Sequence, residues 1–384
     1  MPYMQEECRL TAIDGHTSTL QRTGAAGKTH ADLHGDTWRS ATRRAVQATV
    51  DDFVALRCAP ELKAAGIGIA SDVLRDFIAG GKCVRSTFMY LGWLCGADDD
   101  PAALRAAASL ELLHAFALLQ DDVMDGSTLR RGRPAGHVAF ARWHRHEGLS
   151  GSPDRFGESA AVLLGDLCLV WAAQMMRESG VPASALDRVW PRYDAMRTEL
   201  AVGQFADLIN DASGFPTLDK VLDVSRRKSG NYTVRRPLEM GAAMAGCGEN
   251  VLTMLGRYGD AIGEAFQMRD DVLGIFGSPA VTGKPSSSDL SERKATSVVA
   301  AAYHLAGPTL RRELRTIMSA DRLDAGDVRR WRDLIAATGA VEWIERLIDA
   351  RLTRALSLID ESDIRPAVRA ALADMAAACT ERAA

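Results

Sequence analysis

The sequence has no excess of positive charge and little cysteine. Lys and Arg number 46 against 50 Asp and Glu, which gives a formal net charge of −4. Proteins that bind nucleic acid neutralise phosphates with a basic surface, so this balance argues against nucleic acid as a partner. The 7 cysteines are scattered along 384 residues, odd in number, and never spaced as CxxC. This usage is typical of reduced thiols in a cytoplasmic protein and argues against a disulfide framework or a zinc site.

The sequence also lacks a signal peptide and a long uninterrupted apolar run. Residues 1–37 mix Gly, Thr, His and charge without apolar periodicity, so we expect a disordered tail there. A helix needs about 20 apolar residues to span a membrane. The best candidate, residues 159–176, is interrupted by Asp166. The sequence therefore predicts no membrane span and a cytoplasmic location.

From residue 38 onward the pattern is helical almost throughout. Ala and Leu dominate, alternation typical of strands is missing, and Gly and Pro cluster between periodic segments. No strand–helix alternation, fixed-period repeat or long linker divides the chain, so we expect a single all-α domain over residues 38–384. The predicted helices cover about 39–57, 67–79, 84–95, 101–124, 135–146, 157–178, 184–210, 217–229, 233–246, 249–276, 290–304, 308–318, 325–337, 340–359 and 364–381.

The helix predicted over residues 101–124 leads into three aspartates, Asp121, Asp122 and Asp125. Asp121 and Asp125 are about one helical turn apart and so project from the same face. Carboxylates placed this close normally share a cation, and oxygen ligands without thiolate or a His cluster favour Mg²⁺. Arg130 and Arg131 follow, and guanidinium groups suit phosphate. The stretch predicts a diphosphate site, although one such motif alone is more often a solvated helix end.

A second acidic helix end lies far along the chain. Asp270 and Asp271 follow an apolar run, one turn after Gln267, and a Gly/Pro/Ser loop then carries Lys284 and Lys294. If the two acidic helices face each other in a bundle, as in di-metal carboxylate proteins, their carboxylates would form a cation cage over a central cavity. Two matching helix ends are hard to explain as separate solvated faces.

Further candidates gain meaning only if they reach the same cavity. Lys82 and Arg85 follow a Gly–Gly turn, Lys228 lies between the two acidic helices, and His114 lies two turns before Asp121. Alone, basic residues at a helix start are usually surface decoration. A single His on an apolar helix is more often a satisfied core residue than a ligand.

Taken together, the motifs resemble those of the isoprenyl diphosphate synthase family, the trans-prenyltransferases, over about residues 40–380. They are GGKxxR at Gly80–Arg85, LLHxxxLLQDDxxD at Leu112–Asp125, RRG at Arg130–Gly132, GQxxDL at Gly203–Leu208, KSGNYT at Lys228–Thr233, FQxRDD at Phe266–Asp271 and GKPxxxDL at Gly283–Leu290. The block at residues 155–172 is most similar to bacterial geranylgeranyl diphosphate synthases. The resemblance implies an all-α bundle of the isoprenoid synthase type around a deep central cavity, and a homodimer.

The resemblance also implies a reaction, the head-to-tail trans condensation of isopentenyl diphosphate with dimethylallyl, geranyl or farnesyl diphosphate. Asp121, Asp125 and Asp270 would bind three Mg²⁺ ions that bridge to the allylic diphosphate. The catalytic set it implies is Asp121, Asp122, Asp125, Arg130, Lys228 and Asp270. The allylic diphosphate would be bound by Arg130, Lys228, Lys284 and Lys294, with Ser229 and Gln267 in the wider substrate-binding set. Isopentenyl diphosphate would be bound by Lys82, Arg85, His114 and Arg131.

The residues one or two turns before Asp121 are expected to set product length. Each turn rises about 5.4 Å, close to one prenyl unit. Bulky Phe116 beside small Ala117, with Leu113 a turn further and no insertion in the acidic motif, resembles twenty-carbon synthases. The expected main product is geranylgeranyl diphosphate. Farnesyl diphosphate or another length is the alternative, with Phe116 as ordinary core packing.

Four positions depart from the family pattern. Gly274 replaces the last aspartate of the second acidic motif, Cys83 and Ser86 stand where Arg and Pro are common, and Arg293 stands where Gly is common. The carboxylate missing at 274 is not the one expected to touch metal. We therefore expect activity to survive, and an aspartate restored at 274 to change it only modestly.

Two other functions share parts of this pattern. A terpene cyclase would need a second metal motif of Asn/Asp, Ser/Thr and Glu on one helix, and the nearest candidate, which starts at Asn210, lacks the Glu. Cyclases also lack the set of Lys82, Arg85 and His114. A non-catalytic subunit of a partner synthase usually loses the first acidic motif, which is intact here.

Overall fold

The computed structural model describes residues 35–212, 216–277, 288–291, 294–320 and 323–381, which are almost entirely helical. The first half contains α1 Gly35–Phe53, the π-helix η1 Val54–Cys58, α2 Ala59–Ala64, α3 Gly68–Ile78, α4 Val84–Leu94, α5 Pro101–Met124, β1 Leu129–Arg130, β2 Arg133–Pro134, α6 Gly136–His146, α7 Pro153–Arg177 and α8 Ala183–Ala212. The second half contains α9 Leu218–Ser225, the π-helix η2 Arg226–Arg235, α10 Arg236–Met244, α11 Glu249–Phe276, α13 Ser288–Ser291, α14 Ser297–Leu305, α15 Pro308–Met318, α16 Ala325–Ala337, α17 Ala340–Asp360 and α18 Pro366–Thr380.

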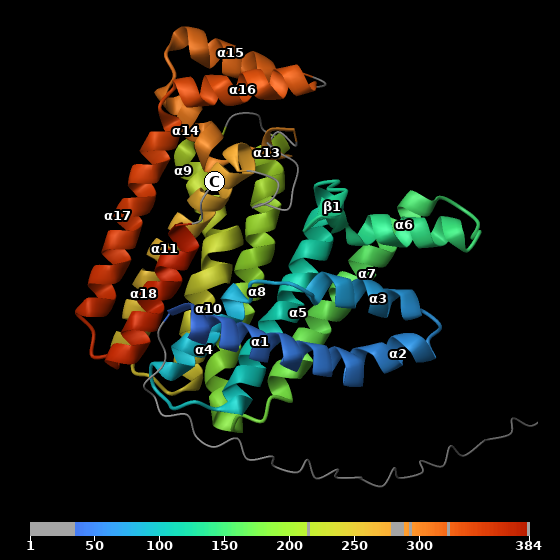
Figure 1. Ribbon diagram of the computed structural model, residues 1–384, viewed down its shortest axis with the longest axis vertical. Coiled ribbons are helices and arrows are strands. Elements are labelled where there is room, and N and C mark those ends of the chain that lie inside the picture. Colours follow the sequence, from blue (N-terminus) through green and yellow to red (C-terminus); the bar gives the residue numbers. More distant parts are fainter. Residues whose placement is uncertain (1–34, 213–215, 278–287, 292–293, 321–322, 382–384) are drawn as a thin grey trace, which may run out of the picture.

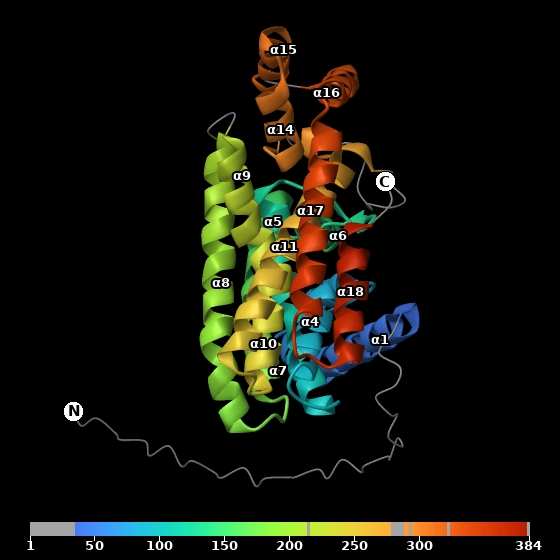
Figure 2. The same cartoon turned by 90° about the vertical axis from the view of Figure 1, so that its left-hand side faces the viewer.

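The long helices run side by side along the vertical axis of Figure 1 and form one bundle. Helix α5 packs against α4 and α7, α10 packs against α4 and α8, and α11 packs against η2 and α17. Figure 2 shows α8 along one edge of the bundle and α17 with α18 on the other side of α11. The expected all-α fold is confirmed, and the two acidic helices, α5 and α11, both belong to the bundle.

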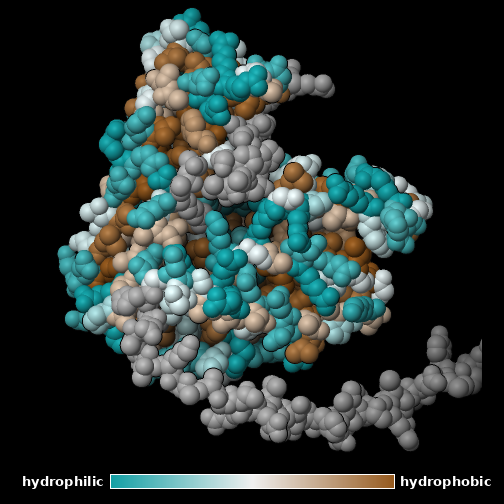
Figure 3. All heavy atoms as spheres, viewed as in Figure 1, coloured by the Kyte–Doolittle hydropathy of each residue, from teal (hydrophilic) through white to brown (hydrophobic). Residues whose placement is uncertain are grey.

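Small residues let the central helices approach closely. Ala103, Ala106 and Ala107 of α5 are fully buried. A Cβ added at Gly92 of α4 would lie 2.2 Å from a backbone oxygen of α10, and one at Gly241 of α10 would lie 1.8 Å from a backbone oxygen of α4. Because any side chain there would separate the helices, the α4–α10 contact depends on both glycines. Outward faces carry mostly hydrophilic residues on the side of the molecule shown in Figure 3.

Helices α5 and α7 are long and apolar enough to cross a membrane, by length and composition alone. Inside the bundle, 61% of the most apolar window of α5 and 44% of that of α7 are buried, and the two helices pack against each other. Core helices of globular proteins pass the same test.

The structure corrects several predicted boundaries. Residues 35–37, assigned to a disordered tail, begin α1, whereas the rest of that segment lies outside the described residues. The helix predicted over 290–304 is two helices, α13 and α14, and the pair predicted over 217–246 is α9, η2 and α10. Helix α2 and the hairpin β1–β2 were not predicted. The hairpin turns through Arg131 and Gly132, both with positive φ, at 53° and 74°.

Candidate active site

A cavity of about 1100 Å³ lies among the loop before α4, α5, α8, η2 and α11. It collects most of the site residues predicted from sequence. In its wall are Lys82, Arg85, His114, Phe116, Ala117, Asp121, Arg130, Arg131, Lys228, Ser229, Gln267, Asp270 and Lys294. Asp122, Asp125 and Leu113 are not among the wall residues, and Lys284 and Arg293 lie outside the described residues.

Asp121, near the end of α5, faces three cations across the cavity. Lys228 Nζ lies 3.2 Å from its Oδ1, and the Arg130 guanidinium lies 3.5 Å from its Oδ2. Burial alone would raise the pKa of Asp121, but Lys228, Lys294 and Arg130 outweigh it and bring the pKa to about 2. Asp121 is therefore ionised at neutral pH.

The other two aspartates of this motif, Asp122 and Asp125, are paired with cations as well. Asp122 is fully buried and accepts a 2.9 Å hydrogen bond from Arg130 Nε, so the structure places it behind Arg130. Asp125 Oδ2 lies 2.6 Å from Lys294 Nζ, although Lys294 is far along the chain. The first acidic motif thus fixes the positions of Arg130 and Lys294 at the cavity.

The second acidic motif, at the end of α11, contributes both of its aspartates, Asp270 and Asp271, to the cavity wall. Asp271 is buried and accepts hydrogen bonds from the backbone nitrogen and hydroxyl of Ser297, at 2.8 and 2.6 Å, and from Gln267 Nε2 at 2.7 Å. Burial raises the pKa of Asp271 to about 7, and these hydrogen bonds limit the rise. Asp271 and Gln267 thereby join α11 to the start of α14.

Lys228 comes from the π-helix η2 and has a second acidic partner that the sequence analysis missed. Asp207 Oδ2 lies 2.6 Å from Lys228 Nζ and also lines the cavity. The GQxxDL motif that contains Asp207 was recognised, but no role was assigned to its aspartate. Burial alone would lower the pKa of Lys228, but Asp121 and Asp207 raise it above its usual range.

A second basic group lies where α4 begins. The Arg85 guanidinium lies 4.3 Å from the centre of the Tyr232 ring, and the Tyr232 hydroxyl lies 3.4 Å from His114 Nδ1. Burial lowers the pKa of His114 well below its usual range, and nearby Arg85 and Arg131 lower it further, so the imidazole is neutral. This end of the cavity therefore combines arginine charges with a neutral hydrogen-bonding ring.

Glu111 and Ser86 complete this group and were not assigned from sequence. Glu111 Oε1 accepts a 2.7 Å hydrogen bond from the Ser86 hydroxyl, and Glu111 lies in the cavity wall. Arg131 donates from one terminal nitrogen to the backbone oxygens of Phe77 and Ala79, at 3.0 and 3.1 Å. Ser86, a departure from the family pattern, therefore has a defined partner.

Part of the remaining cavity wall is apolar. Phe116 and Ala117 of α5 line it together with Leu200, Phe205 and Leu208 of α8. Leu113, proposed to act in chain length, is fully buried outside this wall because it faces the core instead. The apolar wall suits a hydrocarbon tail that extends from the charged end.

Gly274 faces a carboxylate from another element. A Cβ added at 274 would lie 1.8 Å from Asp289 Oδ2 and 2.5 Å from Asp289 Cγ, and Asp289 belongs to α13. Both residues line the cavity. The Asp289 carboxylate therefore stands where a side chain at residue 274 would begin.

This contact changes the expectation for Gly274→Asp. The added side chain must displace the end of the Asp289 side chain and would put two carboxylates close together at the cavity. Since small displacements of groups at a reacting site are costly, we expect a roughly tenfold loss of turnover instead of the modest change expected from sequence. Steady-state kinetics would measure it, with Gly274→Asp/Asp289→Gly as the matched variant in which the clash is removed. Wild-type turnover in the single variant would contradict the steric argument.

The acidic residues suit a metal ion that takes part of its coordination shell from a bound phosphate-bearing molecule. In the described part of the chain, no three His, Cys, Asp or Glu side chains gather closely enough to hold an ion by themselves. Asp121 Oδ1 is buried, and its contact with the protein is the 3.2 Å ion pair with Lys228 Nζ. Mg²⁺ commonly binds one or two carboxylates and completes its shell with water and substrate phosphates. The ionised Asp121 carboxylate beside Lys228 and Arg130 fits that mode.

Comparison with known proteins places the chain among prenyl synthases. A family model for polyprenyl synthetases matches residues 68–335. A geranylfarnesyl diphosphate synthase of Aeropyrum pernix is 31% identical over 272 residues, 70% of this chain and 79% of the relative. A geranylgeranyl diphosphate synthase of Mycobacterium tuberculosis is 30% identical over 284 residues, which cover 74% of this chain and 76% of the relative. The crystal structure of a Corynebacterium glutamicum geranylgeranyl pyrophosphate synthase, complexed with isoprenyl diphosphate and magnesium, matches with a TM-score of 0.84 at 36% identity over 89% of this chain and 99% of that one.

Proposed function

Because the chain belongs to the polyprenyl synthetase family, we propose that it condenses isopentenyl diphosphate with allylic diphosphates and makes mainly geranylgeranyl diphosphate. The observation that carries this proposal is the composition of one cavity. Two acidic helix ends, two groups of basic residues and an apolar wall all line it. A reaction that joins two diphosphates through their hydrocarbon parts needs each of these features.

The allylic diphosphate would bind at the acidic end. Asp121, Asp125 and Asp270 would hold Mg²⁺, which when bound neutralises the charge that develops on the leaving diphosphate. Lys228 and Lys294 are already paired with Asp121 and Asp125. The ammonium groups of Lys228 and Lys294, which lie beside these carboxylates, would donate hydrogen bonds to the phosphate oxygens of the same substrate.

Isopentenyl diphosphate would bind at the other basic group. Lys82, Arg85 and Arg131 line that end, and neutral His114 can donate a hydrogen bond without adding charge. The Tyr232 ring beneath the Arg85 guanidinium limits where that side chain can point.

Bond making follows from this placement. The allylic C–O bond breaks and its electron pair stays with the diphosphate. The terminal carbon of the isopentenyl double bond attacks the allylic cation, and the positive charge moves to the neighbouring tertiary carbon. A proton then leaves the methylene group beside that tertiary carbon, on its diphosphate side, and a new double bond forms. The departed diphosphate can accept that proton, so no Ser–His or Cys–His pair is required. The apolar wall keeps water from the cation.

We also propose that the protein is a cytoplasmic homodimer. Large apolar side chains are exposed on α7 and α8, with Leu163 64%, Val170 58% and Phe205 69% exposed. Phe205 also lines the cavity, so the apolar part of the cavity wall continues into an exposed apolar surface. A second copy of the chain would cover such a surface. Light scattering of the purified protein would test this, and a monomeric mass would contradict it.

The direct test of function is an incubation of the purified protein with Mg²⁺, isopentenyl diphosphate and each allylic primer, followed by product-length chromatography. We expect elongation mainly to geranylgeranyl diphosphate. Cyclic hydrocarbon formed without isopentenyl diphosphate would indicate a cyclase instead. No product from any primer would favour a non-catalytic subunit.

Single charge removals should separate the two diphosphate subsites. Arg85→Ala is expected to raise the Michaelis constant for isopentenyl diphosphate, and Lys228→Ala that for the allylic substrate. Loss of one charge-assisted hydrogen bond costs about 1.5–3 kcal/mol, or roughly ten- to a hundredfold in affinity. Initial rates with one substrate varied at saturation of the other would measure both constants. Equal effects of Arg85→Ala on both would contradict the assignment.

A further inference from the structure

The π-helix η2 places several cavity residues at once. It covers ten residues, Arg226–Arg235, although π-helices usually occur as single-turn bulges. Lys228, Ser229, Tyr232 and Thr233 of this helix all line the cavity. Since a π-helix bonds each residue to the fifth one on, it turns side chains to different directions from those of an α-helix. The direction in which the Lys228 side chain points therefore depends on the contacts that fix the position of η2.

Two glycines let neighbouring helices contact the backbone of η2. A Cβ added at Gly203 of α8 would lie 2.6 Å from the backbone nitrogen of Lys228. On the other side, a Cβ at Gly263 of α11 would lie 2.7 Å from Gly230 of η2. The π-helix is thus enclosed by α8 and α11 at backbone distance.

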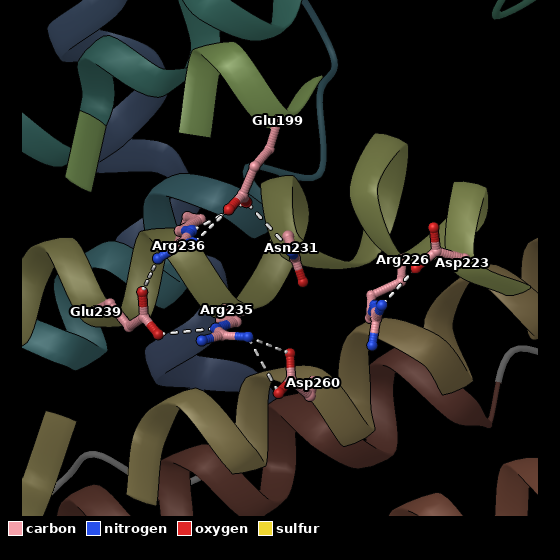
Figure 4. Close-up of polar contacts among 8 residues, drawn as sticks. All are labelled: Glu199, Asp223, Arg226, Asn231, Arg235, Arg236, Glu239 and Asp260. Atoms are coloured by element: carbon pink, nitrogen blue, oxygen red, sulfur yellow. Dashed lines mark hydrogen bonds and ion pairs between the residues drawn. The ribbon is translucent and has the colours of Figure 1, made fainter. Parts of the chain in front are cut away.

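A chain of charges crosses the end of η2, as Figure 4 shows. Asp260 of α11 pairs with Arg235 at 3.0 Å, and Arg235 pairs with Glu239 at 2.8 Å. Glu239 also pairs with Arg236 at 2.6 Å, and the Nε of Arg236 donates to Glu199 of α8 at 3.0 Å. In this chain of ion pairs, α8 and α11 are tied to the junction of η2 and α10.

Glu199 is the member of this network that touches η2 from α8. Its Oε2 accepts a 3.2 Å hydrogen bond from Asn231 Nδ2 as well as that from Arg236. Glu199, Gly203 and Asp207 are spaced by four residues and so share one face of α8. Along this face, Glu199 contacts the end of η2, Gly203 admits the backbone of Lys228, and Asp207 pairs with its ammonium group.

We propose that Glu199 is a positioning residue, which through Asn231 and Arg236 fixes η2 so that Lys228 points at the allylic diphosphate. This inference rests on the proposed function and deepens it. It predicts that damage at Glu199, although this residue lies outside the cavity wall, weakens binding of the allylic substrate more than that of isopentenyl diphosphate, whose subsite meets η2 through the Tyr232 ring.

The test compares Glu199→Gln with Asp260→Asn. Both substitutions remove one charge from the same network and keep the side-chain volume, but Asp260 lies at the end remote from Asn231. Glu199→Gln is expected to raise the Michaelis constant for the allylic substrate about tenfold, because small displacements of a substrate-binding group are costly. The constant for isopentenyl diphosphate should rise by no more than about threefold, because η2 reaches that subsite through the contact of Tyr232 with Arg85. Asp260→Asn should change neither constant by more than about twofold. Its melting temperature should fall by about as much as that of Glu199→Gln.

Two further measurements keep the inference open to refutation. Asn231→Ala removes only the neutral contact and should give a smaller shift of the same constant if Glu199→Gln fails to fold. Calorimetric binding of a non-ionising allylic thiolodiphosphate should weaken in parallel. Equal shifts in Glu199→Gln and Asp260→Asn, or a lower melting temperature with unchanged constants, would reduce the network to a structural role. Failure of the wild type to elongate any primer would instead overturn the proposed function.

Discussion

Replacement of Asp121 by Ala or Asn should reduce turnover by about a thousandfold and leave the helix content intact. Asp121 is ionised, with a pKa of about 2, and its buried Oδ1 lies 3.2 Å from Lys228 Nζ. The variant removes a metal ligand and little core volume, so the fold should survive. Lys228 keeps its contact with Asp207, which limits rearrangement of the cations.

Initial rates and circular dichroism would measure both parts of this result. Asp270→Asn should behave like Asp121→Asn, since Asp270 lies in the same cavity wall at the end of α11. Asp166→Asn is the matched control, because Asp166 of α7 hydrogen-bonds Gln120 from an exposed position and is not part of the wall. Near-normal turnover of Asp121→Asn, with unchanged helicity, would refute the diphosphate site.

Much of the fold could be predicted because its long helices carry clear signals. Helices α5, α11, α15 and α16 have the predicted boundaries, and α5 begins with a Pro directly after a capping aspartate. The π-helix η2 could not be predicted, since the expected helices over 217–229 and 233–246 placed a break at Gly230 inside it, and no sequence signal distinguishes π-helical from α-helical hydrogen bonding. It is maintained by glycine contacts and ion pairs from helices remote in sequence.

The same distinction applies to the site. The motif resemblance named most of the residues that line the cavity, although Asp122, Asp125 and Leu113 are not among them. It could not distinguish Asp121, which faces the cavity, from adjacent Asp122, which is buried against Arg130. The contact of Gly274 with Asp289 likewise depends on a tertiary approach that no local pattern records.

Ala117→Phe should change the main product from geranylgeranyl to farnesyl diphosphate. Ala117 and Phe116 line the apolar wall one turn before Asp121, opposite α8. One helical turn rises about 5.4 Å, close to one prenyl unit, so an aromatic ring at 117 would occupy the space of the last unit added. Phe116→Ala should have the opposite effect and allow longer chains. Leu113 faces the core, so we expect no direct effect of that residue on length.

Chromatography of products from a farnesyl diphosphate primer would measure both shifts. With this primer, Ala117→Phe should lose most of its elongation, whereas it should still extend a geranyl diphosphate primer once. This difference separates a shortened tunnel from general inactivation. If both variants give the wild-type length distribution, the floor of the tunnel lies elsewhere, and the wall of α8 formed by Leu200, Phe205 and Leu208 becomes the next place to add bulk.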